Sequence, residues 1–297
     1  MTKLVLIDGN AIMHRAYHAL PPLTSPDNTP INAVYGFTTM LLKIVEDLSP
    51  THIAVSFDRP EPTFRKKLYK QYQAQRPEMD DALGEQFEKV KILLSAMNIP
   101  VYEKAGFEAD DVLGTIAKKA KVDEVVIVTG DKDILQLVDP KIKLYMPIKG
   151  LSAGKLFGIK ETIEKLGVNP SQIVDFKALV GDPSDNYKGV PGIGPKIAQS
   201  LLVKYKNLDN IYKNLDKIGG TVGEKLKLGK ESAFESQKLA QIVTTVETDF
   251  DLEKADKWGL AHPQVLNICT DFGFKTIPKR IQTLSKKLAS KNQTSLF

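Results

Sequence analysis

The sequence is poor in the residues that several functional classes require. It has a single cysteine, Cys269, which excludes an intramolecular disulfide and a cysteine-rich zinc site. It has only 4 histidines, and no uninterrupted apolar stretch approaches the roughly 18 residues of a membrane-spanning helix. The first ten residues already place Asp8 after a short apolar run, unlike a secretion signal. We therefore expect a cytoplasmic protein in a reducing compartment, without a membrane span.

Arginine is also scarce. Of the 41 basic residues only five are Arg, namely Arg15, Arg59, Arg65, Arg76 and Arg280. Four of them lie in the first 76 residues, where a planar guanidinium suits bidentate contact with phosphate, although an N-terminal bias in composition would give the same pattern. The net charge of +5 is compatible with a polyanionic partner and equally with a plain solvated surface.

The hydrophobic pattern predicts an α/β protein. Apolar runs at 3–8, 52–57 and 125–129 alternate with longer helical patterns, which is typical of crossover units on a central, mostly parallel sheet flanked by helices. The predicted helices are 32–48, 85–97 and 108–120. The length of 297 residues allows one large body or two packed subdomains.

The strand signal ends near residue 168. We therefore expect an α/β catalytic subdomain over 1–167 and a helical subdomain over 168–290. Within the latter, the Gly- and Lys-rich segment 217–230 is predicted as a surface loop running into a helix. The tail after 288 is predicted to be disordered, with 291–297 as a flexible end.

Carboxylates follow the apolar runs where parallel strands end. Because ligands bind beyond the carboxyl ends of such strands, side chains at these positions point into one crevice. The candidates at strand ends are Asp8, Asp58, Asp131 and Asp133, joined by Glu108, Asp110 and Asp111 at the start of a helix and by Asp182 and Asp185 on a Pro-containing turn. Each alone is also typical of a helix cap or a turn, but nine on one rim would repel one another without bound cations. Oxygen ligands favour Mg²⁺ or Mn²⁺, and two such ions are suited to phosphodiester hydrolysis.

A basic segment with interleaved tyrosines follows Asp58. If 63–75 is helical, one of its faces carries basic and polar side chains that could meet a nucleic-acid strand. The residues concerned are Lys66, Tyr69, Lys70 and Gln73 on that face, Tyr72 and Arg76 beside it, and Arg65 and Lys67 in the same segment. The alternative is a solvated amphipathic helix.

A Gly-rich turn precedes a predicted helix at 189–202. The backbone amides of 192–196, which include Gly192 and Gly194, could face a phosphate, reinforced by Lys196. Such a turn contacts the duplex backbone without reading bases. The alternative is a Gly-Pro loop without a ligand.

With these motifs assembled, the chain resembles the 5′ nuclease (flap endonuclease) family, most nearly the exonuclease domain at the N-terminus of bacterial DNA polymerases I. The resemblance extends from LIDGNAIMHRAYHALPPL through GFEADDVLGTIA and VIVTGDKDILQLV to LVGDPSDNYKGVPGIGPKIA. It implies a PIN-like sheet, a helical arch over about 63–95, and a helix-hairpin-helix over about 171–205 that grips duplex DNA and holds a K⁺ ion. All nine family carboxylates have counterparts here.

The resemblance implies a monomeric, nucleoid-associated 5′ nuclease that uses two Mg²⁺ or Mn²⁺ ions to cut DNA near 5′ ends, nicks or flaps, or at RNA primers. Asp8, Asp58 and 108–111 would hold the first ion, and Asp131, Asp133, Asp182 and Asp185 the second. Arg15, Tyr72 and Arg76 match residues that orient the 5′ strand.

The chain departs from the family at two places. Gln73 replaces a lysine that many members have in the arch, and Lys66 or Lys70 is the candidate to supply that charge. The chain also ends at 297 without polymerase sequence, and its last residues, including Gln293, Leu296 and Phe297, are similar to a peptide that docks bacterial sliding clamps. The rival interpretations are a DNA-structure binder that has lost catalysis and a small ribonuclease with a related sheet.

Overall fold

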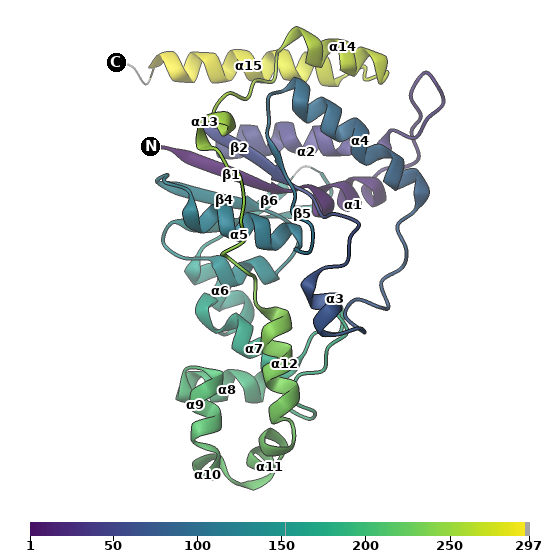
Figure 1. The fold of residues 1–297 in the computed structure, drawn as a ribbon. Coiled ribbons are helices and arrows are strands. Elements are labelled where there is room, and N and C mark those ends of the chain that lie inside the picture. The colour runs from purple at the N-terminus through teal and green to yellow at the C-terminus, as the bar shows by residue number, and fades with distance from the viewer. Residues whose placement is uncertain (152, 295–297) are drawn as a thin grey trace.

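A six-stranded sheet forms the centre of the protein, which is described here from a computed structural model covering residues 1–151 and 153–294, with only the backbone at 149 and 291–294. The strand order is β3-β2-β1-β4-β5-β6, and only β6 is antiparallel to its neighbour (Figure 1). The strands are β1 (Lys3–Asp8), β2 (His52–Ser56), β3 (Val101–Tyr102), β4 (Glu124–Val128), β5 (Ile142–Lys149) and β6 (Ala153–Phe157). The predicted mostly parallel sheet is therefore confirmed.

Helices cover both faces of the sheet, which explains why the central strands are apolar between their ends. Val5 and Ile7 of β1 pack on one side against α1 (Gly9–Ala19), α2 (Asn32–Leu48) and α4 (Asp81–Ala96). Leu4 and Leu6 face the other side, where they join a cluster with residues of α5 (Ala109–Lys119). Because β1 pairs parallel with both β2 and β4, the carboxyl ends of these three strands lie along one edge of the sheet.

The chain after β6 is helical among the described residues, as predicted. Helices α8–α11 form the end of the molecule opposite α14 and α15 (Figure 1). The elements after β6 are α6 (Ile159–Leu166), η2 (Pro170–Gln172), α7 (Ile173–Val180), α8 (Pro195–Tyr205), α9 (Leu208–Lys213), α10 (Leu215–Ile218), α11 (Gly220–Leu228), α12 (Lys230–Ala240), α13 (Leu252–Ala255), α14 (Pro263–Asp271) and α15 (Ile277–Thr294), whereas the short helix η1 (Asp133–Leu137) lies between β4 and β5. The last three helices return to the sheet, where α14 packs against α4 and α15 against α2.

Two local predictions are wrong. The segment 217–230 is mostly helical, because α11 follows α10 after Gly219 and Gly220, whose positive φ angles make a tight turn. The chain does not become disordered at 288, since the backbone of α15 continues to Thr294. Leu296 and Phe297 lie outside the described residues. None of the described helices combines the length and the apolar character needed to cross a bilayer.

The predicted helix over 63–75 is also wrong beyond its first turns. Helix α3 (Phe64–Leu68) ends after five residues, and the chain continues as turns. At Gln73 the backbone has φ +54°, and its N–H donates to the carbonyl of Asp185 at 3.0 Å. A contact with a distant loop therefore replaces the helical hydrogen bond, and Lys66, Tyr69, Lys70 and Gln73 do not share one helix face.

Candidate metal and nucleic-acid site

A cavity of about 530 Å³ opens at the carboxyl ends of β1, β2 and β4. Its lining includes seven of the nine predicted carboxylates, and the two that it lacks are Asp111 and Asp182. The seven are Asp8, Asp58, Glu108, Asp110, Asp131, Asp133 and Asp185. Strand ends, the starts of α5 and η1, and the loop before α8 bring these side chains together from positions up to 177 residues apart, taking Asp8 and Asp185 as the extremes.

Two of the carboxylates are held in place by neighbouring elements. Asp8 caps α1 through Oδ1, and its Oδ2 accepts a hydrogen bond of 2.6 Å from Thr129 Oγ1 at the end of β4. Asp58 accepts a hydrogen bond of 2.7 Å from the backbone N–H of Ala109, and Asn10 Oδ1 accepts from the Asp58 backbone at 2.9 Å. The carboxylate positions are thus fixed without any ligand.

Burial and mutual repulsion disfavour the charged form of these carboxyl groups. Burial, followed by repulsion from neighbouring carboxylates, raises the pKa of Asp8 to about 7. Burial also raises the pKa of Glu108 to about 7, although Arg65 opposes the shift. The pKa of Asp110 is raised for the same reasons, burial first and then Asp131 and Asp8. Without a cation these carboxyl groups tend to stay protonated, whereas a hard divalent cation favours their charged form. The group of oxygens therefore fits such an ion.

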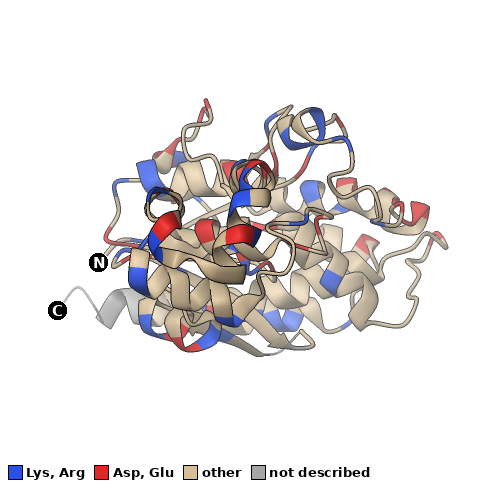
Figure 2. Cartoon of the chain, turned by 90° about the horizontal axis from the view of Figure 1, so that it is seen from below, with Lys and Arg blue, Asp and Glu red and all other residues tan. Residues whose placement is uncertain are grey.

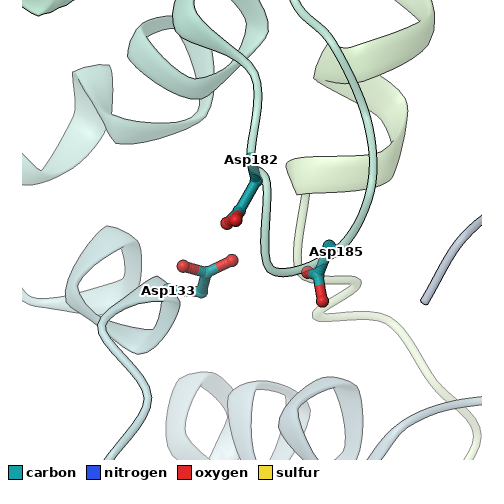
Figure 3. A group of neighbouring side chains, drawn as sticks. All are labelled: Asp133, Asp182 and Asp185. Carbon is teal, nitrogen blue, oxygen red and sulfur yellow. The ribbon is translucent and has the colours of Figure 1, made fainter. Parts of the chain in front are cut away.

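A second acidic group lies at the edge of the cavity. Carboxylate oxygens of Asp133, Asp182 and Asp185 all lie within 4.8 Å of one another, and Figure 3 shows Asp133 and Asp182 turned toward each other. Asp133 begins η1, whereas the other two belong to the loop between α7 and α8. Three carboxylates at this spacing also fit a divalent cation with oxygen ligands.

Lys177 of α7 lies between two members of that group. Its ammonium pairs with Asp133 and, at 2.5 Å, with Asp182 Oδ2. Burial and repulsion from Asp131 raise the pKa of Asp133 to about 7 despite this lysine. Burial would also raise the pKa of Asp182, but Lys177 and Ser184 outweigh it and hold that pKa below its ordinary value.

Asp111 and Arg65 are engaged with each other, contrary to both predictions. The side chain of Asp111 is fully buried, and both of its oxygens accept hydrogen bonds from the Arg65 guanidinium. Arg65 is itself only 2% exposed, so it presents no free cation to DNA. Arg65 lines the cavity and supports Asp111, which lies outside the lining; neither oxygen of Asp111 is free for a metal ion, and no donor of Arg65 is free for phosphate.

The turn segment after α3 contacts the acidic site through Asp185. Arg76 Nη2 donates to Asp185 Oδ1 at 2.7 Å, Gln73 Nε2 to the same oxygen at 3.1 Å, and the Tyr72 hydroxyl to Oδ2 at 3.3 Å. Tyr72 is buried, whereas Arg76 is half exposed and lines the cavity. The predicted strand-binding residues Tyr72, Gln73 and Arg76 thus meet the carboxylates.

The remaining predicted contact residues divide into two sets. Lys66 lines the cavity, whereas Lys70 and Arg15 do not. Arg15 instead donates from Nε to the carbonyl of Gly150 at 3.0 Å.

The Gly-rich turn lies apart from the cavity lining, directly before α8. In it Gly192 has φ +80°, Gly194 caps α8 and Lys196 is exposed on the first turn.

Sequence reasoning missed Lys177, Thr129, Asn10 and His14, which contact or line the acidic site. Thr129 and Asn10 could have been found, because both flank strand-ending carboxylates. Lys177 carries no such signal, since it is one of many lysines. Figure 2 shows Lys, Arg, Asp and Glu interspersed in the view from below, so overall charge does not single it out either.

Two family models match the chain. The model for the 5′-3′ exonuclease, N-terminal resolvase-like domain, matches residues 3–167, and the model for the 5′-3′ exonuclease, C-terminal SAM fold, matches residues 168–262. DNA polymerase I of Caldicellulosiruptor bescii is 42% identical over 285 residues, which are 94% of this chain and 33% of that protein. DNA polymerase I of Bacillus subtilis is 39% identical over 282 residues, 94% of this chain and 32% of that protein. The chain thus spans about a third of the length of these relatives.

Solved structures share the fold. The T5 D15 protein co-crystallised with metal ions has a TM-score of 0.66 and 20% identity, with 96% of this chain and 99% of that chain covered. The catalytic core of Rad2 in complex with DNA substrate has a TM-score of 0.64 and 18% identity, with 95% and 91% covered. At these identities the likeness concerns the arrangement of the elements alone.

Proposed function

The chain belongs to the 5′-3′ exonuclease family, and on that premise we propose that it is a metal-dependent, structure-specific 5′ nuclease that hydrolyses DNA phosphodiesters near 5′ ends and flap junctions. One observation carries the proposal beyond membership of the family. Seven of the predicted carboxylates line one cavity together with Lys66, Tyr72 and Arg76, so groups for metal ions and for a phosphate backbone share one space.

Within that space the acids have different tasks. Asp8, Asp58, Glu108 and Asp110 would hold one divalent ion, Mg²⁺ or Mn²⁺, and Asp131, Asp133, Asp182 and Asp185 a second. Such ions, when bound, supply an activated water and charge stabilisation at the leaving oxygen. The fixed hydrogen bonds of Asp8 and Asp58 keep the donor set preorganised for this chemistry.

The cations of the cavity would orient the DNA. Arg76 and Lys66 are exposed enough to reach a phosphate, and Tyr72 lies next to Arg76 against Asp185. The loop before α8 would contact the duplex through backbone amides near Gly192 and Gly194, with Lys196 beside them and a K⁺ ion completing the site. The catalytic core of Rad2 and a T5 D15 flap endonuclease were both solved in complex with DNA, which supports DNA as the substrate.

The test is cleavage of a 5′-flap duplex labelled at both ends, in Mg²⁺ and in chelator, with Asp131→Asn as the variant. We expect Mg²⁺-dependent cuts at the junction that the variant loses while it still binds the flap. Asp123→Asn is the matched control, because this carboxylate lies on the surface and binds only Thr2 at the start of the chain. Tight flap binding without cleavage by the native chain would instead favour the DNA-structure binder.

We also propose that the end of the chain docks a bacterial sliding clamp through 293–297, since an apolar Leu-Phe end can fill a pocket. Tethering would raise the effective concentration of the enzyme on DNA. Deleting 293–297 should abolish clamp binding in a titration and leave flap cleavage without the clamp unchanged. Equal clamp affinity after the deletion would contradict the idea.

A further inference from the structure

Lys177 places its ammonium inside the second acidic group. The lysine side chain is 15% exposed, and its Nζ contacts Asp133 and Asp182, the latter at 2.5 Å. These are two of the three carboxylates whose oxygens lie within 4.8 Å of one another. The third, Asp185, is paired with Arg76 at 2.7 Å. Every carboxylate of this group therefore has a cation of the chain itself as a partner.

A divalent ion and this ammonium require the same oxygens. Carboxylate oxygens bind Mg²⁺ at about 2.1 Å and larger divalent ions at up to about 2.6 Å, so an ion shared by Asp133 and Asp182 has to lie between them. That is where Lys177 Nζ lies. Two positive charges at this separation repel each other strongly in a partly buried site.

The Lys177 ammonium can move away from the two carboxylates, whereas the backbone of Lys177 is held in place. Helix α7 packs against α8, α12 and η1, so its path is fixed on several sides. The side chain, in contrast, is a flexible four-carbon stem that can turn its charge toward solvent. Lys177 can therefore exchange with an ion without rearranging the loop that carries Asp182.

We propose that Lys177 is a resident counter-ion, which neutralises Asp133 and Asp182 in the metal-free protein, is displaced when a divalent ion binds there, and so sets the affinity for the second ion. The inference rests on the metal site of the proposed nuclease. It makes Lys177 a positioning residue, because it acts through the metal ligands and not on the substrate.

A counter-ion of this kind differs from an ordinary stabilising pair in a measurable way. It stabilises only the metal-free protein, so its removal lowers the melting temperature in chelator and enlarges the rise that Mg²⁺ produces. A structural ion pair supports both forms equally. Lys143 provides the comparison, because it pairs with Glu124 at 2.7 Å at the opposite ends of the strands.

The experiment is a Mn²⁺ titration of the DNA-free protein followed by electron paramagnetic resonance, with melting curves in chelator and in Mg²⁺. We expect Lys177→Met to bind its weaker ion with a dissociation constant at least about tenfold smaller than the native chain, because a competing charge is gone. Lys177→Arg should bind that ion as weakly as the native chain, and Lys143→Met should leave both Mn²⁺ affinities unchanged.

An unchanged or weaker second-ion affinity in Lys177→Met would overturn the proposal and show that the lysine supports the ligands. If Lys177→Met folds only in Mg²⁺, the counter-ion role is supported, and if it does not fold at all, Lys177→Gln repeats the titration with a neutral side chain that still donates hydrogen bonds. Flap cleavage by the native chain is scored separately. A native chain that binds two ions but does not cleave would refute the nuclease and leave the ion competition standing.

Discussion

The guanidinium of Arg65 and the carboxylate of Asp111 form a bidentate pair, with Nη1 to Oδ2 at 2.7 Å and Nη2 to Oδ1 at 2.8 Å. The remaining donors of Arg65 bind Glu108 at 3.0 Å and the carbonyls of Leu239 and Gln241 at 2.9 and 2.7 Å. One side chain therefore joins α3, α5 and the end of α12 at the wall of the cavity. All five of its N–H groups are used.

Replacing Arg65 with Met should destabilise the protein severely. The change leaves Asp111 buried and charged without its partner, which costs about 3–5 kcal/mol of unfolding free energy. Urea denaturation in chelator measures it. The control is Arg59→Met, since Arg59 pairs with Glu61 on the surface and both side chains are 43% exposed. A loss for Arg65→Met no larger than that of the control would show that the buried pair is dispensable.

Stability in the absence of metal should fall as the pH rises. The pKa values of Asp8, Glu108 and Asp133 are each raised to about 7 from ordinary values of 3.8, 4.5 and 3.8. Between about pH 4 and 7 the unfolded chain therefore releases protons that the folded chain retains, and this linkage weakens folding as the pH increases. Protonation of these carboxyl groups thus stabilises the folded, metal-free protein below that pH range, and this contribution is lost above pH 7.

The measurement is the melting temperature in Mg²⁺ minus that in chelator, compared at pH 5 and pH 7.5. Divalent ions compete with these protons, so the increment should be larger at pH 7.5. Taking the difference removes the contribution of titrating groups far from the site. Equal increments at the two pH values would show that the carboxylates are not coupled to metal binding.

The carboxylate rim was predictable because its signal is local. Asp8 ends an apolar strand and Asp131 follows another within a few residues, and the parallel sheet necessarily brings such ends together. The acidic cavity therefore follows from strand pattern and topology. The hydrophobic pattern likewise predicted the helices at 32–48 and 108–120 almost to the residue.

The environment of the basic residues could not be predicted in this way. Arg65 is buried because a carbonyl 174 residues further along the chain accepts its Nε–H, and no local pattern reveals that contact. Gln73 departs from a helical conformation because Asp185, 112 residues away, binds both its backbone and its side chain. Lys177 likewise differs from the surface lysines through its contacts with Asp133, 44 residues earlier in the chain, and with Asp182. Tertiary contacts outweigh periodicity at each of these positions.

Gly189 should tolerate no side chain. It has φ +62°, and an added Cβ would lie 2.3 Å from the backbone nitrogen of Gly181 at the base of the loop that carries Asp182 and Asp185. Gly189→Ala should cost at least about 3 kcal/mol, because the strained conformation and the backbone clash add. Gly106→Ala is the matched control, since Gly106 has φ +83° but no atom within 4 Å of the added Cβ.

Chemical denaturation compares the two variants, and we expect about 1 kcal/mol for Gly106→Ala. Only Gly189→Ala should also shrink the melting-temperature increment produced by Mg²⁺, because its loop supplies two carboxylates. Similar losses of unfolding free energy in both variants would mean that the backbone at the base of the loop shifts to accommodate the added methyl group.

Gln73→Lys should raise the single-turnover rate of flap cleavage. The side chain of Gln73 lines the cavity beside Asp185 Oδ1, so an ammonium there would add positive charge where a phosphate is expected. We expect about a tenfold increase at low salt and a smaller one at high salt, because solvent screens partly exposed charges. Gln75→Lys is the control, since Gln75 binds the carbonyl of Pro183 and lies outside the cavity lining. An unchanged rate in Gln73→Lys would show that Arg76 and Lys66 already supply the positive charge needed at this place. An equal gain in Gln73→Lys and Gln75→Lys would show that the added charge acts only by attracting DNA in general.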